Sequence, residues 1–529
     1  MFRTHLDVLK SSSTSFPCEA AFRVPSASSS SQSVEWDTIT YQRFYDDVLL
    51  FARYWARKLR RDNIPQRSVV GLWLGGFSYT DVLHIYGLSR AGYIPQMFSL
   101  RLPNPDVIFE LLHKAHARAL ICDPSFANVS DGCPVPLHNA VGFSEIDGGN
   151  EELPSVPAVD IDDVAFYFHT SGSTSGSPKL VPCSYAWINS VVEKSQQVCI
   201  PYREDRRDVV TWLGSMCHIG QTFMLIGSLQ HGACTVQPTK LPFTSAELMD
   251  MITNAGVNRL YQFSAFLSMH FRAARQDPKL ASLLTGLDEV LTCGMPLPRE
   301  DLEWARNSGL HLMNLFGSTE VGGATLLSSR VRGSDASVLT PLKGTHYLFK
   351  PIQQSEGAHQ STARLFEFIV MADSPDCPDV SLRSSDGTFH TGDLFQEING
   401  SYVFCGRDDD WIKSQNSLRC DTKAIEDNAR QMCGNVISDC IVVGTGRPSP
   451  TMFVEASADG VDEAKLKKDI LRKTRQFHSR RYMHERIVSD KFIVIVPRGS
   501  LPRTATKGNI RRKAVEEMYK DRLDAIYGY

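Results

Sequence analysis

A run of glycine and hydroxyl residues between Ala165 and Lys179 has the chemistry of a phosphate-binding loop. Its sequence, AFYFHTSGSTSGSPK, begins as an apolar strand and becomes a loop that a lysine closes. Backbone N–H groups and hydroxyls of such a loop surround an anion-sized space, and glycines permit close approach. The lysine adds a mobile positive charge. We therefore predict phosphate binding here, with a flexible Ser/Gly loop as the alternative, because the Walker A pattern is absent.

Alternating strand and helix patterns surround this loop. Residues 68–74 and 118–123 are apolar runs typical of buried strands, and residues 81–90 have a helical pattern. A further helix is predicted from apolar side chains at helical spacing, namely Phe44, Val48, Phe51 and Trp55. Strands that alternate with helices over several hundred residues predict an α/β fold of parallel sheets covered by helices.

The two ends of the chain differ from this pattern. Residues 11–33 are rich in serine and predict an exposed N-terminal segment rather than a core element, and residues 126–160 predict a loop. After a strand at 402–405 comes a charged turn, then a shorter block with strands at 437–443 and 492–496 and a helix at 463–477. We predict an N-terminal segment (1–35), a large domain (36–406), a hinge (407–410) and a small α+β C-terminal domain (411–529).

Composition excludes several classes of function. The 529 residues are 42% hydrophobic and 22% charged with a formal net charge of −3, and no basic stretch with interleaved aromatics suggests nucleic acid. The 13 cysteines form no CxxC pair, which disfavours disulfide frameworks and zinc sites and favours a reducing compartment. No apolar run approaches the length of a membrane span, and no secretory signal is present. We expect a cytoplasmic protein.

Four more motifs follow the phosphate loop along the chain: Cys293–Leu297 (CGMPL), Asn314–Glu320 (NLFGSTE), Thr391–Asp393 with Gly406–Asp409, and Leu501–Gly508 (LPRTATKG). With the loop, their order and spacing resemble the adenylate-forming superfamily, which includes acyl-CoA synthetases, aryl-CoA ligases and adenylation domains of nonribosomal peptide synthetases. The resemblance covers residues 165–508. Among its members, the chain most resembles fungal stand-alone or reductase-type adenylation domains, because some of these share the Lys-Gly order of the last motif.

The resemblance implies a role for each motif in binding ATP and Mg²⁺. It assigns the phosphates to Thr170, Ser171, Gly172, Ser173, Thr174 and Lys179. It assigns the metal to Glu320 and Thr174, and the α-phosphate to Thr319. The adenine is assigned to Gly294, Met295, Asn314, Phe316, Gly317 and Ser318, with Phe404 beside the nucleoside. Asp393 is expected to accept hydrogen bonds from the ribose hydroxyls, and Arg407 to bind ribose or phosphate.

The resemblance also implies that the C-terminal domain is mobile and rotates about a hinge at Asp409. In one pose Lys507 bridges the carboxylate and the α-phosphate, and in the second pose Lys413 comes near the site. Three departures from the family pattern affect these assignments. Ser175 lengthens the phosphate loop, Asn416 replaces a usual glycine, and Lys507 lies one position early.

The substrates are less sharply defined. His218, in a segment similar to the family's Pro-x-x-His-x-x-Gly, is expected to line the acyl pocket, with a core histidine as the alternative. No carboxylate lies between Leu213 and Gln230, which disfavours an α-amino acid and favours a neutral aryl or aliphatic acid. We predict an acyl-adenylate intermediate followed by transfer to CoA. The alternatives are a separate carrier protein as acceptor and a catalytically silent nucleotide-binding relative.

Overall fold

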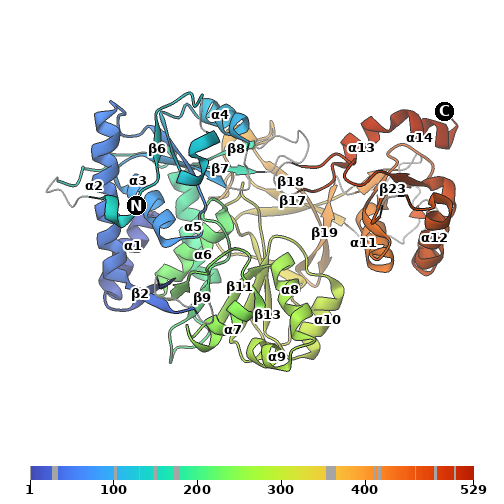
Figure 1. Cartoon of the computed structure of the whole chain (residues 1–529), viewed down its shortest axis with the longest axis horizontal. Coiled ribbons are helices and arrows are strands. Elements are labelled where there is room, and N and C mark those ends of the chain that lie inside the picture. The colour runs from blue at the N-terminus through green and yellow to red at the C-terminus, as the bar shows by residue number, and fades with distance from the viewer. Residues whose placement is uncertain are drawn as a thin grey trace.

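A computed structural model describes the chain at residues 2–26, 34–99, 104–129, 132–146, 152–170, 179–352, 365–408, 411–413, 419–458, 460–479, 481, 485–504 and 508–528. Its body consists of two large sheets and the helices around them. A smaller C-terminal unit stands to one side of this body (Figure 1). The predicted fold class, a large α/β body with a small separate α+β C-terminal unit, is confirmed.

The larger sheet has 13 strands and two halves of different character. Strands β9 to β13 pair in parallel, whereas β13 to β19 continue the sheet with antiparallel pairs. The sequence analysis predicted only the parallel half. In sheet order the strands are β16 (Tyr347–Pro351), β17 (Leu365–Val370), β18 (Phe389–Ile398), β19 (Ser401–Arg407), β15 (Val338–Pro341), β14 (Leu326–Ser328), β13 (Leu312–Phe316), β12 (Glu289–Cys293), β11 (Arg259–Phe263), β9 (Val209–Thr211), β10 (Cys234–Val236), β1 (Ala20–Pro25) and β2 (Trp36–Thr40).

The second sheet of the body has six strands. Its order is β6 (Leu137–Asn139), β5 (Ala119–Cys122), β3 (Val69–Leu74), β4 (Ile94–Ser99), β7 (Val164–Thr170) and β8 (Lys179–Ser184). All pairs are parallel except the β7–β8 hairpin. The strands predicted at 68–74 and 118–123 are confirmed as β3 and β5. The segment 126–160, predicted to be a loop, contributes the edge strand β6.

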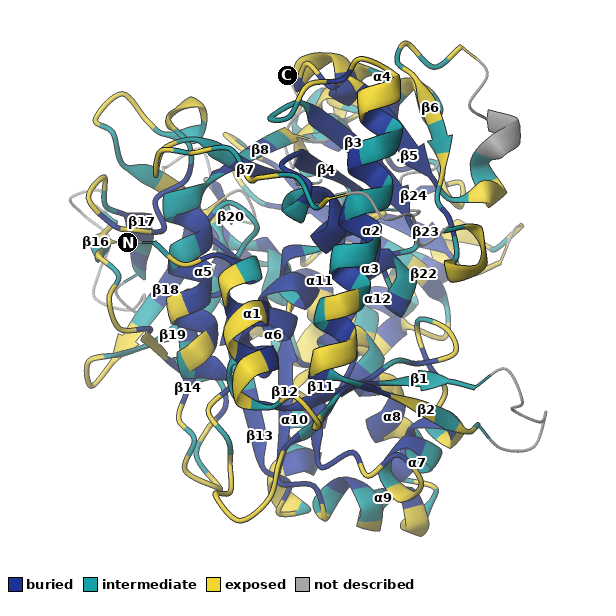
Figure 2. Ribbon diagram, turned by 90° about the vertical axis from the view of Figure 1, so that its left-hand side faces the viewer, coloured by how far each residue is buried: buried dark blue, intermediate teal, exposed yellow. Residues whose placement is uncertain are grey.

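Helices fill three layers around these sheets. Helices α1 (His5–Ser15), α2 (Tyr41–Arg61), α3 (Tyr79–Arg90), α5 (Tyr185–Val198) and α6 (Ile219–Gln230) share one apolar core with both sheets. Helix α4 (Pro105–Lys114) covers the other face of the smaller sheet. On the other face of the larger sheet lie α7 (Ser245–Thr253), α8 (Ser264–Ala274), α9 (Pro278–Thr285) and α10 (Arg299–Asn307). Figure 2 shows β12 almost wholly buried, whereas α1 turns an exposed face outward.

The predicted helix with apolar residues at 44, 48, 51 and 55 is confirmed as α2. All four side chains are buried in the shared core, and Thr40 caps the helix by accepting from the N–H of Arg43. The helix predicted at 81–90 is confirmed as α3, whose N-terminus carries a capping box of Ser78 and Asp81. Local spacing and caps were enough to locate both helices.

The interpretation of residues 11–33 as an exposed segment is wrong for its described part. Helix α1 buries Ser12 and Ser13, and Ser12 donates a hydrogen bond of 2.8 Å to the carbonyl of Leu229. Strand β1 buries Phe22 and pairs with β10 of the larger sheet. Serine composition misled here because a buried serine hydroxyl is tolerated when it finds a backbone acceptor.

The C-terminal unit has its own cores and a three-stranded sheet in the order β22 (Ile437–Val443), β23 (Thr451–Ala456) and β24 (Ile493–Val496). Around it lie the β20–β21 pair (Trp411–Lys413 and Arg419–Asp421) and the helices α11 (Thr422–Cys433), α12 (Glu463–Ser479), α13 (Arg512–Met518) and α14 (Lys520–Tyr527). The strands and helix predicted in this block are confirmed as β22, β24 and α12. All 13 cysteines are free thiols. Within the described ranges, no helix has the length and apolarity to cross a bilayer.

Candidate active site

The parallel half of the larger sheet brings Phe263 and three predicted residues, Gly294, Phe316 and His218, to one edge. Phe263 ends β11, Gly294 follows β12, and Phe316 ends β13, while His218 lies between β9 and α6 as the residue before the first turn of α6. Cross-strand pairing sets Phe263 against Cys293, and Cys293 against Leu315. The carboxyl ends of parallel strands are where open α/β sheets bind ligands.

The two ends of the predicted phosphate loop are neighbours across the β7–β8 hairpin. Thr170, the last residue of β7, pairs with Lys179, the first residue of β8. The lysine is exposed and therefore reaches the space outside the strand ends. The residues between them, with the predicted Ser171, Gly172, Ser173 and Thr174, lie outside the described residues.

His169 anchors this hairpin and was not singled out from the sequence. Its Nδ1 lies 2.9 Å from the carbonyl of Met97, its Nε2 lies 3.2 Å from the amide nitrogen of Gln96, and its ring stacks on Phe98 at 4.7 Å. Burial lowers the pKa of His169 to about 4. A neutral ring that donates through Nδ1 and accepts through Nε2 satisfies both contacts. The one feature of the sequence that could have pointed to His169 is its position directly before Thr170.

The turn after β13 contains the predicted Ser318, Thr319 and Glu320 and is closed by its own backbone. The N–H of Gly323 donates to the carbonyl of Ser318 over 2.8 Å, and that of Gly322 donates to Thr319 over 3.3 Å. A Cβ on Gly317 would lie 2.5 Å from the carbonyl oxygen of Gly323. Only glycine fits at position 317, because the two arms of the turn are in contact there.

Strands β18 and β19 bring together the predicted Asp393, Phe404 and Arg407. Asp393 pairs with Arg407, and Nη1 of the arginine lies 3.4 Å from Oδ1 of the aspartate. The register shifts between this pair and the Phe395–Phe404 pair, which is the signature of a β-bulge. Phe404 and Arg407 are three residues apart, so their side chains would point to opposite faces of a regular strand. Because of the bulge, both side chains point to the same face of the sheet.

Phe316 joins this group from β13. Its ring centroid lies 5.1 Å from that of Phe404 and 5.1 Å from that of Phe395. Phe395 is fully buried, whereas Phe316 and Phe404 are partly exposed. Asn314, two residues earlier in β13, is held by a 2.9 Å hydrogen bond from its N–H to the Ser328 hydroxyl. The sheet thus presents the aromatic rings of Phe316 and Phe404 beside the buried carboxylate of Asp393.

Phe263 occupies the space next to His218. The two ring centroids are 6.3 Å apart. A Cβ on Gly214 would lie 2.6 Å from the Phe263 ring, and a Cβ on Gly294 would lie 3.1 Å from it. The phenyl ring therefore packs against backbone on two sides. Met295, the next predicted residue, is 58% exposed and so faces the solvent side of this region.

In the C-terminal unit, the described residues give only the base of the turn that carries Lys507. Arg503 and Ile510 form an isolated β-bridge, and the N–H of Thr504 donates to Asn509 over 2.8 Å. The guanidinium of Arg503 binds Asp439 at 2.8 Å and Glu455 at 2.7 Å. Lys507 itself lies outside the described residues, as do Asp409 and the side chain of Lys413.

Comparison with known proteins agrees with this geometry. Residues 19–348 match the family described as AMP-binding enzyme, and residues 409–529 match the AMP-binding enzyme C-terminal domain. The chain belongs to the AMP-binding enzyme family. It is therefore an adenylate-forming enzyme that activates a carboxylic acid.

Two curated relatives show how the family is represented in fungi. The AMP-binding domain-containing enzyme iboA of Amanita muscaria (strain Koide BX008) is 36% identical over 497 residues, which cover 91% of this chain and 95% of that protein. The adenylate-forming reductase Nps11 of Serpula lacrymans is 23% identical over 498 residues. The match covers 85% of this chain but only 43% of the reductase, so the chain spans less than half of the reductase's length.

Solved structures share the fold at low sequence identity. The o-succinylbenzoate CoA synthetase of Bacillus subtilis, bound to its acyl-adenylate intermediate, superposes with a TM-score of 0.74 at 17% identity over 98% of both chains. The anthranilate CoA ligase AuaEII superposes with a TM-score of 0.72 at 18% identity, over 98% of this chain and 97% of the ligase. At this identity the likeness concerns the fold.

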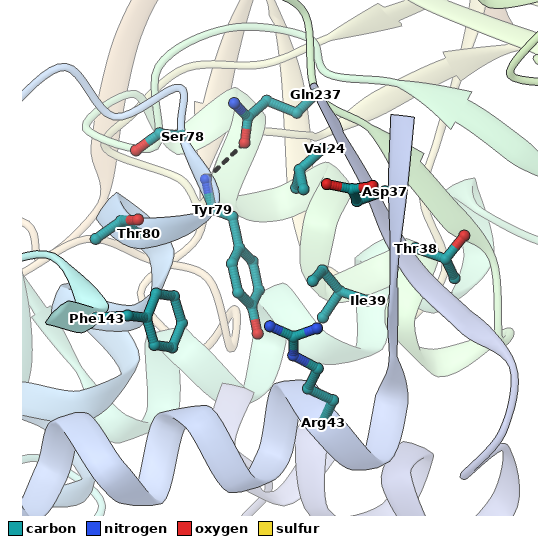
Figure 3. A pocket seen from close by; sticks show the side chains of 10 residues that line it. All are labelled: Val24, Asp37, Thr38, Ile39, Arg43, Ser78, Tyr79, Thr80, Phe143 and Gln237. Atoms are coloured by element: carbon teal, nitrogen blue, oxygen red, sulfur yellow. Dashed lines mark hydrogen bonds between the residues drawn. The ribbon is translucent and has the colours of Figure 1, made fainter. Parts of the chain in front are cut away.

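A separate hollow of about 480 Å³ lies between β1–β2 and the start of α3, where Gln237 follows β10. Figure 3 shows Tyr79, Arg43 and Gln237 around it, with the Tyr79 N–H donating to the Gln237 side chain over 2.7 Å. None of the residues predicted for nucleotide or acid lines this hollow. It is therefore distinct from the edge formed by β11, β12 and β13.

Proposed function

We propose that this enzyme is an acid–thiol ligase. It uses ATP to convert a neutral aryl or aliphatic carboxylic acid into an acyl-adenylate and then transfers the acyl group to CoA. The observation that carries the proposal is the group formed by Phe316, Phe404, Asp393 and Arg407, which combines an aromatic surface, a carboxylate and a cation at one edge of the sheet.

This group suits a nucleoside monophosphate. Phe316 and Phe404 offer a surface on which a purine stacks. The carboxylate of Asp393 accepts hydrogen bonds from two ribose hydroxyls, since each of its oxygens has free lone pairs. Arg407 contacts Asp393 and is partly exposed, so it reaches ribose or the α-phosphate. Gly294, Met295, Asn314, Gly317 and Ser318 complete the adenine side.

The residues present also suit Mg²⁺. Glu320 is partly exposed, and within the described ranges its carboxylate has neither a hydrogen-bond donor nor an ion-pair partner. A carboxylate without a competing cation is the ligand that Mg²⁺ takes, together with substrate phosphates and water. Glu320 and Thr174 would hold the ion, and Thr319 would bind the α-phosphate. When bound, the ion neutralises charge on the phosphates.

The chemistry divides between the two units. In the first step a carboxylate oxygen of the acid bonds to the α-phosphorus, and the bond to the leaving pyrophosphate breaks. Lys507 stabilises the charge that collects between them, and the loop at Thr170–Lys179 with Ser171, Gly172 and Ser173 holds the β- and γ-phosphates. In the second step a thiol sulfur attacks the acyl carbon and AMP leaves. A hinge at 407–410 lets the C-terminal domain (411–529) exchange Lys507 for Lys413 between steps.

The acid pocket lies beside His218 and Phe263. Their rings, and the absence of a carboxylate between Leu213 and Gln230, support a neutral acid without an α-ammonium group. A buried ammonium group would need such a partner. His218 lines the pocket in this proposal, and Phe263 limits its depth because its ring packs against Gly214 and Gly294.

The charge of the C-terminal unit supports a negatively charged acceptor. Residues 411–529 hold 23 Lys and Arg against 15 Asp and Glu, although the whole chain has a net charge of −3. CoA carries several phosphate charges and fits such a surface. The same observation favours the second candidate, an acidic carrier protein loaded in trans. Relatives of both kinds occur: an anthranilate–CoA ligase is 26% identical over 190 residues, and a proline–carrier-protein ligase is 26% identical over 281 residues.

The test is ATP–pyrophosphate exchange against a panel of aryl, short-chain, medium-chain and amino acids, followed by AMP release with and without CoA. Exchange with one class of neutral acid, and AMP release that requires CoA, are the expected results. Exchange without CoA-dependent AMP release would replace CoA by a carrier protein. Absence of exchange with every acid, in a protein that binds ATP, would overturn the proposal in favour of a silent relative.

A further inference from the structure

One face of helix α5 lies against the turn that contains Glu320. Trp187, Val191 and Lys194 are spaced four and three residues apart, so they lie on the same side of the helix. Their exposed fractions are 2%, 0% and 1%. This is an unusual place for a lysine, because lysine is almost never fully buried unless it is paired.

Two of these side chains hold successive carbonyls of the turn. The indole N–H of Trp187 donates to the carbonyl of Glu320 over 3.0 Å. The ammonium group of Lys194 donates to the carbonyl of Val321 over 2.6 Å. The main chain on both sides of the Val321 Cα, directly after Glu320, is therefore held by one helix.

The turn lies so close to α5 that a side chain at position 322 would crowd the helix. A Cβ on Gly322 would lie 3.0 Å from Cγ2 of Val191 and 3.4 Å from Nζ of Lys194. Gly322 also has a φ of +76°, which glycine adopts without strain. The contact is thus built into the turn as well as into the helix.

Lys194 is balanced by a buried aspartate from another part of the chain. Its Nζ lies 2.8 Å from Oδ2 of Asp376, which is as buried as the lysine. Asp376 also accepts from the hydroxyls of Ser374, at 2.6 Å, and Tyr347. Burying two charges gives little net stability compared with apolar side chains of similar volume. A role in fixing position explains such a pair better than a role in stability.

Strand β8 leads from the phosphate loop to helix α5. The helix starts at Tyr185, directly after β8, and β8 starts at Lys179. Strand β8 and helix α5 together therefore connect the cation that closes the loop with the turn that carries Glu320. We infer that Trp187 and Lys194 are positioning residues that set Glu320 relative to the β7–β8 hairpin, so that both meet the same Mg²⁺-bound ATP. This inference rests on the proposed role of Glu320.

The first test is Trp187→Phe, which removes the N–H donor and keeps an aromatic ring in the core. ATP binding is measured by calorimetry with and without Mg²⁺. We expect binding with Mg²⁺ to weaken about three- to tenfold, the value of one hydrogen bond, and binding without Mg²⁺ to change less than about twofold. The matched control is Trp55→Phe, because Trp55 is also fully buried but donates to His84, between α2 and α3. This control should bind ATP as the unmodified protein does.

A second variant, Lys194→Met with Asp376→Asn, removes both charges together and leaves neither unpaired. It should weaken Mg²⁺-dependent ATP binding about tenfold or more, since it frees the Val321 carbonyl. If this double variant does not fold, the result for Trp187→Phe alone tests the inference. Equal behaviour of Trp187→Phe and Trp55→Phe, or an equal loss with and without Mg²⁺, would overturn the inference.

Glu320→Gln separates this inference from the function on which it rests. If Glu320→Gln keeps the full Mg²⁺ dependence, the metal role of Glu320 is wrong and the positioning role falls with it. If Glu320→Gln loses that dependence while the α5 variants keep it, only the positioning role is wrong. Loss of the dependence in all three supports both.

Discussion

The body and the C-terminal unit differ in charge and in how they hold their candidate residues. Residues 1–410 contain 33 Lys and Arg against 44 Asp and Glu, whereas residues 411–529 contain 23 against 15. In the body, Phe316 and Asp393 belong to strands of the larger sheet, where Phe316 packs against a buried cluster that includes Phe395 and Asp393 pairs with Arg407. In the C-terminal unit, the turn around Lys507 is fixed at its base by Arg503.

This difference supports a division of labour. A sheet edge holds its side chains in one geometry and suits recognition of a rigid nucleotide. A basic unit that joins an acidic body through a short connection is attracted to it, and its cations reach the phosphates only when it approaches. We therefore expect that substitutions can alter nucleotide binding and catalysis separately. Each of the following predictions changes either the body or the C-terminal unit.

The largest expected effect is on the C-terminal side. Lys507→Ala should lower acyl-adenylate formation about 100-fold or more, because it removes a charge that acts mainly in the transition state. ATP binding, which the proposed function assigns to the body, should stay within about threefold. Single-turnover adenylation and calorimetry measure the two quantities. Lys513→Ala is the matched control, and a larger loss in that variant would assign the role to Lys513.

The next effect concerns the connection between the two units. Asp409→Pro should leave adenylation unchanged and slow thiol transfer about tenfold or more, because proline fixes φ at a hinge that must change it. Asp409→Ala keeps the backbone free and should transfer normally. Separate measurement of pyrophosphate exchange and thioester formation distinguishes the steps. Equal slowing of both would mean that the hinge lies elsewhere.

A smaller effect is expected on the body side. Asp393→Asn should raise the KM for ATP about tenfold, because it weakens charge-assisted hydrogen bonds to the ribose, and should leave the KM for the acid unchanged. Initial-rate kinetics with each substrate varied in turn give both constants. Asp386→Asn, in the exposed turn before β18, is the control. A change in the acid KM alone would place Asp393 at the acyl pocket instead.

The smallest effect is on stability as pH falls. Burial lowers the pKa of His84, His169 and His270 to about 4 and that of His5 to about 3, all in the body, and lowers that of His478 in the C-terminal unit to about 4. An unfolded histidine titrates near 6.5, so between about pH 6.5 and 4 the unfolded chain binds protons that the folded chain does not, and stability is lost.

Calorimetry should therefore show the melting temperature of the body falling by about 5 °C between pH 7.5 and 5, and that of the C-terminal unit falling less. His169→Gln should reduce the pH dependence of the body, because it removes one of the groups that must be buried uncharged. If both transitions shift equally with pH, buried histidines of the body are not the cause.

Much of the fold could be predicted from local patterns. The spacing of Phe44 and Trp55 indicated α2, and the apolar run at 68–74 indicated β3, because each element buries a continuous face. The antiparallel half of the larger sheet could not be predicted in this way. Strands such as β14 and β15 are three and four residues long, too short to show a period, and β15 pairs with β19, which lies far along the chain.

The candidate site was predicted in part for the same reason. Phe316, Asp393 and Arg407 lie in local motifs that a sequence displays directly. Trp187 and Lys194 lie in no such motif, and His169 lies in the strand part of the phosphate-loop sequence without a role that its type suggests. A histidine, a tryptophan and a lysine at those positions are ordinary residues of a strand and a helix until their partners are known.

Three properties follow from the sequence alone: the order of the motifs, the positions of the long helices and buried strands, and the opposite charges of the two regions. These properties depend on residue type and on spacing along the chain. Three others are visible only in the folded chain: α1 and β1 belong to the core, a bulge brings Phe404 and Arg407 to one face of β18, and α5 holds the carbonyls of Glu320 and Val321. Those facts depend on contacts between residues far apart in the chain, which no local pattern specifies.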